Sequence, residues 1–134
     1  VNNKPISLIK FSPVDLALID ADTHNKTPIT IPFISPAIGK PVAAIGFAAG
    51  DTHFTISPMF VMGYEYGYLC VNNLLYFGYS GGPIVDINGY LAGIMVKSNP
   101  QWNFGLAITN TTIREFLGPD INDVFLPLTM SDFQ

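Results

Sequence analysis

The hydrophobic residues of this chain fall in short runs that are separated by glycine, proline and asparagine. The runs are rich in β-branched and aromatic side chains, which favour strands over helices. The sequence predicts strands in this way at residues 42–47, 54–62, 68–72, 83–87, 90–97 and 104–108. Because such runs follow one another closely along the chain, we expect an all-β fold arranged as a barrel.

Two further strand signals are local. The pair Asn88-Gly89 separates two apolar runs, and this pair is the strongest short-range signal for a tight β-hairpin. Near the start of the chain, Asp15 precedes a short apolar run at residues 16–19. We therefore expect an upstream strand with the Asp15 carboxylate at its mouth.

One segment has the spacing of a helix, at residues 109–117. Asn110 is the expected N-cap, and Gly118 with the proline after it is expected to end the helix. The apolar positions that share one helical face are Ile113, Phe116 and Leu117. The tail that follows is too apolar to be simply disordered, so we expect it to pack on the domain or on a partner.

The most informative chemistry is a serine set among glycines, at residues 77–86. Ser80 lies between Gly78 and a glycine pair, and an apolar strand follows. Because glycine has no Cβ, the backbone can turn sharply, present the serine hydroxyl and leave the amides of Gly78 and Ser80 facing one point. Two such donors would form an oxyanion hole. Serine alone is a weak nucleophile, so this interpretation requires a base and an acid that orients the base.

Three segments carry a family resemblance. Residues 15–18 (Asp-Leu-Ala-Leu), 78–83 (Gly-Tyr-Ser-Gly-Gly-Pro) and 89–94 (Gly-Tyr-Leu-Ala-Gly-Ile) resemble the trypsin-like serine proteases, most closely their disulfide-free Deg/HtrA branch. The resemblance extends over roughly residues 5–117, with the motifs in the family's order. It implies a chymotrypsin-like double β-barrel, with the second barrel essentially complete, the first barrel partial, and one short C-terminal helix.

The resemblance also implies how the single protease domain at residues 1–134 is divided. Residues 1–22 would be a remnant of the first barrel, and residues 23–36 would connect the barrels. Residues 37–118 would form the second barrel and its closing helix. Residues 119–134 would be a C-terminal extension.

In this family Ser80 would be the nucleophile and Asp15 the acid that orients a histidine. The family's histidine precedes the aspartate, whereas His24 and His53 both follow Asp15. Neither position faces the nucleophile in the family's layout. We therefore expect a serine endopeptidase whose histidine lies outside this chain, because the chain is a fragment or a processed piece, and we expect the chain alone to be nearly inactive. An N-terminal segment that carries this histidine is then an expected partner, beside a peptide or protein substrate.

Two alternatives stay open. The chain can instead be an inactive pseudoprotease that binds peptides or proteins, for example by strand pairing along residues 96–98. A purely structural, capsid-like β-barrel is the third reading.

The resemblance also places a substrate pocket between three segments. The substrate-binding residues that it implies are Leu74, Leu75, Phe77, Val96, Lys97, Ser98, Gly105 and Ala107. Leu74 would form the pocket floor, and no carboxylate lies nearby in the sequence. A buried basic side chain would lack a partner there, so we expect an apolar residue before the scissile bond.

Composition narrows the function classes. Of the 134 residues, 49% are apolar and only 12% are charged, and the formal net charge is −4. No basic run is present, which argues against a nucleic-acid groove or an anionic membrane surface. Cys70 is the only cysteine, so no intrachain disulfide can form, and we interpret it as a structural thiol. No membrane-spanning run, metal-ligand spacing or cofactor motif is evident, and nothing in the sequence indicates a compartment.

Overall fold

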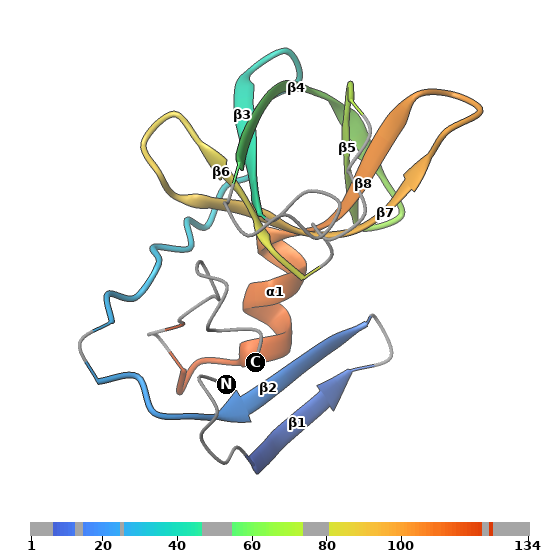
Figure 1. Ribbon diagram of the computed structural model, residues 1–134. Helices are drawn as coiled ribbons and strands as arrows, with labels where there is room; N and C mark the ends of the chain where they lie inside the picture. Colours follow the sequence, from blue (N-terminus) through green and yellow to red (C-terminus); the bar gives the residue numbers. More distant parts are fainter. Residues whose placement is uncertain are drawn as a thin grey trace.

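The computed structural model describes residues 7–12, 15–24, 26–46, 55–73, 81–121 and 124. Its elements are β1 (Ser7–Ser12), β2 (Leu16–Asp20), β3 (Pro41–Gly46), β4 (Thr55–Glu65), β5 (Tyr68–Val71), β6 (Pro83–Asp86), β7 (Leu91–Asn99), β8 (Phe104–Thr109) and α1 (Asn110–Leu117). Figure 1 shows a barrel at the top, the β1–β2 hairpin at the bottom, and α1 between them.

The barrel is closed by six antiparallel strands in the order β3-β4-β5-β8-β7-β6. Alternate residues of each strand point inward, so that β3 contributes Val42 and Ala44 and β5 contributes Leu69 and Val71 to one buried apolar cluster. Closure leaves no unpaired sheet edge around this cluster. The predicted mainly β fold with a barrel and one short helix is confirmed.

A second apolar cluster lies outside the barrel, where the hairpin and α1 pack on β7 and β8. Its buried members are Leu16, Ile31, Leu91, Ile108, Ile113 and Leu117. They come from β2, the connection after it, β7, β8 and α1. This cluster therefore joins the hairpin to the barrel by way of the helix (Figure 1).

The connection between the hairpin and the barrel is held on α1 by polar side chains. Asn110 accepts a hydrogen bond from the Ser35 hydroxyl at 2.6 Å, and its amide donates to the Ile34 and Leu91 carbonyls. The guanidinium of Arg114 donates two hydrogen bonds to the Ile31 carbonyl. Asn110 and Arg114 of the helix thus fix the path of a segment that lies 75 to 83 residues earlier in the chain.

The predicted N-cap is wrong by one residue. Thr109 has extended backbone angles and its side-chain oxygen accepts a hydrogen bond from the Thr112 amide, so Thr109 is the N-cap. Asn110 is the first helical residue and is fully buried in the network described above. Its side chain is engaged with the connection and with β7, and is not available for capping. In the tail, Val124 forms an isolated antiparallel bridge with Ile29.

Candidate active site

The glycine-rich segment around Ser80, at residues 77–82, is called the serine turn below. Its end, at Gly81 and Gly82, is hydrogen-bonded to β7. The Gly81 amide donates to the Met95 carbonyl at 2.8 Å, and the Met95 amide donates to the Gly82 carbonyl at 3.0 Å. Gly81 has φ +84°, in the region that favours glycine. The residue that follows Ser80 is therefore held in an unusual backbone conformation against a central barrel strand.

Several predicted site residues lie outside the described residues. They are Ser80, Gly78, Leu74, Leu75, Phe77 and His53. The barrel fixes the chain on both sides of residues 74–80. On the β5 side, the Phe60 amide donates to Asn72 Oδ1 at 2.7 Å and the Asn72 amide donates to the Phe60 carbonyl at 3.2 Å. On the other side lies Gly81, bonded to Met95.

Asp15 lies in the turn that joins β1 to β2. Its φ is +63°, and its side chain is exposed. Aspartate is several-fold enriched among non-glycine residues with such angles, so this residue type suits the turn. The next residue, Leu16, is buried in the second apolar cluster, which fixes the turn from one side. In Figure 1 the adjoining ends of β1 and β2 lie on the right, the side of the molecule where β5, β7 and β8 are found.

The part of β7 after Met95 extends beyond the serine turn. The register between β7 and β8 shifts between Met95 and Lys97, so Val96 is an extra residue on β7. Val96 packs partly buried against the second apolar cluster, and Lys97 is exposed. Ser98 pairs with Gly105 across the sheet.

Ala107 pairs with Met95 and is fully buried in the barrel core. The structure therefore brings Val96, Lys97, Ser98 and Gly105 together on the strands beside Gly81, and places Ala107 beneath them. Their role as a substrate pocket stays a prediction.

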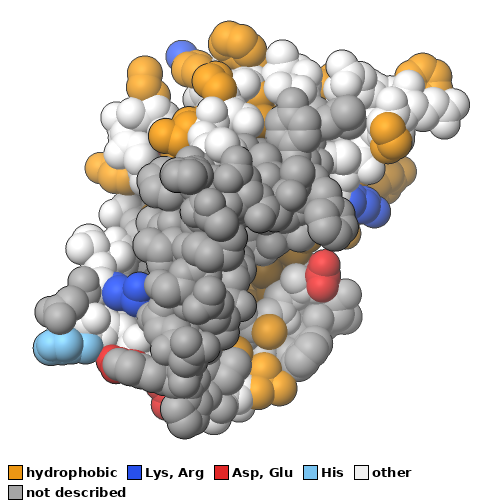
Figure 2. Space-filling view, viewed as in Figure 1, with side chains coloured by type: hydrophobic (Ala, Val, Ile, Leu, Met, Phe, Trp, Pro, Cys, Tyr) orange, Lys and Arg blue, Asp and Glu red, His pale blue; other side chains and the backbone are white. Residues whose placement is uncertain are grey.

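Opposite charges flank the space between barrel and hairpin. On the right of Figure 2, hydrophobic side chains are visible between the barrel and the hairpin, with a basic side chain on the barrel side and an acidic one on the hairpin side. This is the side toward which the β1–β2 turn points in Figure 1.

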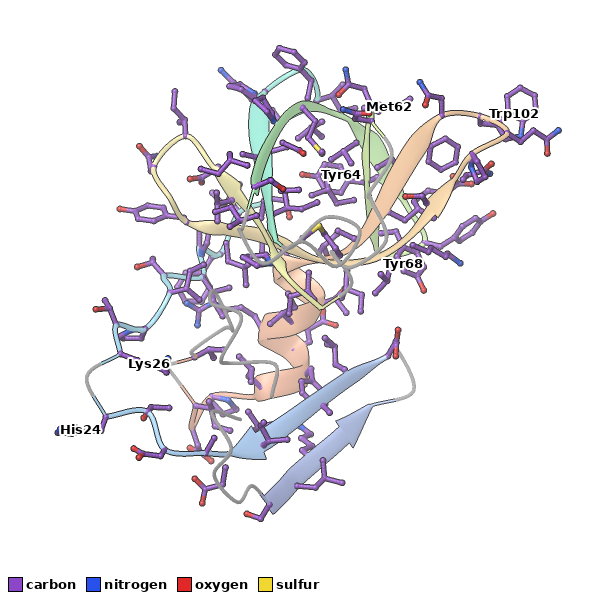
Figure 3. The ribbon with its side chains drawn as sticks, in the orientation of Figure 1. His24, Lys26, Met62, Tyr64, Tyr68 and Trp102 are labelled. Atoms are coloured by element: carbon purple, nitrogen blue, oxygen red, sulfur yellow. The ribbon has the colours of Figure 1, made fainter. Side chains whose placement is uncertain are left out.

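His24 is exposed in the connection, and its backbone amide donates to the Asp22 carboxylate at 3.0 Å. Figure 3 shows His24 on one side of the molecule and Tyr68 of β5 on the other, beside β7. The part of β7 after Met95 lies on the Tyr68 side, since Lys97 lies over the Tyr68 ring. His24 therefore lies far from Tyr68 and the part of β7 beside it.

Two described groups have perturbed acidities. Burial raises the pKa of the Cys70 thiol, and the negative charge of Glu65 raises it further. A thiol with a raised pKa stays protonated near neutral pH and is a poor nucleophile. Burial also raises the pKa of Tyr64, against an opposing hydrogen bond with Ser35, and the Tyr64 hydroxyl donates to the Pro36 carbonyl. The Cys70 thiol and the Tyr64 hydroxyl are therefore interpreted as structural groups.

Sequence reasoning did not identify Tyr68 as part of the site. Its ring packs partly buried on the second apolar cluster, and the Lys97 ammonium lies 5.5 Å from the ring centroid. Only the strand pairing β5-β8-β7 brings these two residues together.

Within the described ranges, no group of three or more His, Cys, Asp or Glu side chains is arranged to hold a metal ion. No helix in the same ranges is long and apolar enough to cross a membrane.

The sequence matches a known protein family. The family described as trypsin-like peptidase domain matches residues 2–94, which include Asp15 and Ser80. No curated protein sequence matches the chain.

Solved structures of similar fold are proteases. The active form of the Rv3671c protease from M. tuberculosis superposes with a TM-score of 0.75 at 18% identity, over 92% of this chain and 62% of that chain. The serine endoprotease from Yersinia pestis has a TM-score of 0.72 at 26% identity, over 84% of this chain and 42% of that chain. The inactive form of Rv3671c has a TM-score of 0.71 at 20% identity, over 84% and 65%. The chain thus spans less than two thirds of the length of each of these relatives.

Proposed function

This chain belongs to the trypsin-like peptidase family, and we propose that it acts as a serine endopeptidase with Ser80 as its nucleophile. The observation that carries the proposal is the pair of hydrogen bonds that joins Gly81 and Gly82 to Met95. A nucleophile turn must be rigid to keep the serine hydroxyl at attack distance, and this pair ties the end of the turn to a closed barrel.

The proposed reaction is acyl transfer to serine followed by hydrolysis. Ser80 Oγ forms a bond to the peptide carbonyl carbon while a histidine takes the hydroxyl proton. The amides of Gly78 and Ser80 would donate to the oxyanion, and each such donor contributes about 3 kcal/mol in comparable sites. The histidine then passes the proton to the leaving amine, and the C–N bond breaks. Water, activated by the same histidine, hydrolyses the acyl-enzyme and releases Ser80.

In this scheme Asp15 would hold the histidine in the correct tautomer and stabilise the imidazolium. The exposed position of Asp15 on the β1–β2 turn supports this role, because the carboxylate can receive a hydrogen bond from outside the hairpin. We propose that the histidine comes from a polypeptide segment outside these 134 residues. The remote position of His24 supports this, and a peptide or protein would be the substrate.

Labelling with a fluorophosphonate tests the proposal directly. The probe is added to the complete protein and to its Ser80→Ala variant, with Ser57→Ala on β4 as a matched serine control. We expect wild type and Ser57→Ala to be labelled and Ser80→Ala to remain unlabelled, since the reagent forms a covalent bond only with an activated serine. Mass spectrometry of the labelled peptide identifies the serine.

The contrary result is also informative. A complete protein that is folded, shown by a cooperative thermal transition, and that stays unlabelled at Ser80 would exclude the catalytic proposal. The inactive, peptide-binding alternative would then replace it.

A further inference from the structure

Lys97 lies on β7 close to the residue that is hydrogen-bonded to the end of the serine turn. Met95 is the residue of β7 that bonds to Gly81 and Gly82, and Lys97 follows two residues later on the same strand. A regular strand rises about 3.3 Å per residue and Val96 is an extra residue between the two, so the Lys97 backbone lies at most about 7 Å along β7 from that contact. A peptide whose carbonyl reaches the serine turn would therefore pass close to this lysine.

In the described part of the chain, an aromatic ring, and not a carboxylate, holds the Lys97 ammonium in place. It lies over the Tyr68 ring, and among the described residues no carboxylate forms an ion pair with it. Tyr68 is itself held by the second apolar cluster, so the ring gives the ammonium a fixed support. A ring face occupies only one side of an ammonium, which has three donors to offer.

Two other basic side chains of the described residues are used differently. Lys10 donates to the Phe116 carbonyl at the end of α1, and Arg114 donates to the Ile31 carbonyl. Both cations satisfy backbone oxygens and hold the hairpin or the connection on the helix. Lys97 has no such structural oxygen in this part of the chain, which leaves its charge available to a ligand.

We propose that Lys97 is a specificity-determining residue that selects substrates with a glutamate or aspartate close to the scissile bond, on the side that lies along β7. This inference rests on the proposed protease function. The negative net charge of the whole molecule does not oppose it, since charges further apart than about 10 Å are largely screened at 0.1 M salt. A short-range pair between the ammonium and a carboxylate persists under that condition.

Fluorogenic peptide amides test the proposal on the complete protein. Each peptide carries valine before the reporter and either Glu, Gln or Lys at one of the three preceding positions. At one of these positions we expect kcat/KM for Glu to exceed that for Gln about three- to tenfold. Lys97→Met should abolish this ratio by lowering kcat/KM for the Glu peptide to that for the Gln peptide, and Lys97→Glu should favour the Lys peptide. Lys40→Met, at an exposed lysine before β3, should keep the wild-type ratio.

A binding measurement separates this proposal from the proposed function. The same peptides, labelled with fluorescein in place of the reporter, are titrated and followed by anisotropy. Preferential binding of the Glu peptide that Lys97→Met removes, without cleavage, would uphold the role of Lys97 and contradict the protease function. Cleavage with equal rates for Glu and Gln, or a Glu preference that survives Lys97→Met, would overturn the role of Lys97 alone. Absence of both cleavage and selective binding overturns both, and a wild-type melting temperature of each variant shows that the variants are folded.

Discussion

At the scale of single residues, Asn110 has the most demanding environment in the described structure. It is fully buried, and its amide group bonds to Ser35 and to the carbonyls of Ile34 and Leu91. No buried side-chain polar atom of the described residues lacks a hydrogen-bond partner, which reflects the high cost of leaving one unpaired. Asn110 thus joins the helix, the connection and β7 at one point.

We expect Asn110→Ala to lower the free energy of unfolding by about 2–3 kcal/mol, because buried carbonyl oxygens would lose their donor. Glu115→Ala, at an exposed position of the same helix, should change it by less than about 0.5 kcal/mol. Urea denaturation followed by circular dichroism measures both values. Equal stability of the two variants would contradict the network.

For Asp15, the substitution Asp15→Asn should preserve the fold and remove most of the activity. Asparagine also tolerates positive φ, and the side chain is exposed, so the melting temperature should be unchanged. If Asp15 orients the histidine, kcat falls about 10³- to 10⁴-fold, because the wrong tautomer is then held. Asp20→Asn, at the other end of β2, is the control, and undiminished turnover in Asp15→Asn would exclude the assigned role.

At the scale of elements, Gly93 shows how closely β7 and β8 approach. A Cβ built on Gly93 would lie 2.7 Å from the Ile108 carbonyl oxygen and 3.1 Å from Ala107 Cβ. The first of these is a backbone atom that cannot move without distorting the strand pairing. Gly63 on β4 is different, because a Cβ there would meet no atom within 4 Å.

Gly93→Ala should therefore destabilise the protein by about 1–3 kcal/mol through overpacking. Gly63→Ala should be neutral or stabilising by up to about 1 kcal/mol, since alanine restricts the unfolded chain. Differential scanning calorimetry of the two variants gives the comparison. A Gly93→Ala protein as stable as wild type would mean that β7 and β8 are less tightly packed than described.

The barrel strands were predictable because their signals are local. Each of the six predicted apolar runs overlaps one of β3 to β8, and the Asn88-Gly89 signal lies in the turn between β6 and β7. β1 was not predicted, because Ser7, Lys10 and Ser12 interrupt its apolar pattern. The N-cap prediction failed for a long-range reason, since burial of Asn110 depends on partners distant in sequence.

The candidate site was predictable only where the chemistry is local. The glycines around Ser80 and the position of Asp15 before β2 are visible in the sequence. The support of Lys97 by Tyr68 depends on three strands being paired, and no spacing rule reveals that. The residues at 74–80 lie outside the described residues, so their predicted roles remain to be tested by the labelling experiment.

At the scale of the whole molecule, the two apolar clusters stabilise different parts of the structure. The first fills the barrel and involves only barrel strands, whereas the second joins the hairpin to the barrel through α1. Leu117 belongs to the second cluster and Val61 to the first. Loss of either side chain should therefore affect different parts of the chain.

We expect Leu117→Ala to cost about 2–4 kcal/mol and to increase amide hydrogen exchange in β1 and β2, while the barrel amides stay protected. Val61→Ala should instead increase exchange across the barrel strands. Hydrogen exchange with mass spectrometry resolves the two patterns. Identical exchange maps for both variants would show that the hairpin and the barrel unfold as one unit.

The order of elements along the chain has a consequence for synthesis on the ribosome. β1 and β2 are made before the barrel strands, yet the helix on which they pack follows the barrel strands, at residues 110–117. The barrel strands form a continuous stretch between them and can fold as soon as β8 has emerged. The hairpin can pack on the rest of the domain only later. The apolar contacts that offset the entropy of closing this long loop form only when α1 is present. The turn that carries Asp15 is therefore fixed relative to the barrel only after α1 has been made, long after the hairpin itself.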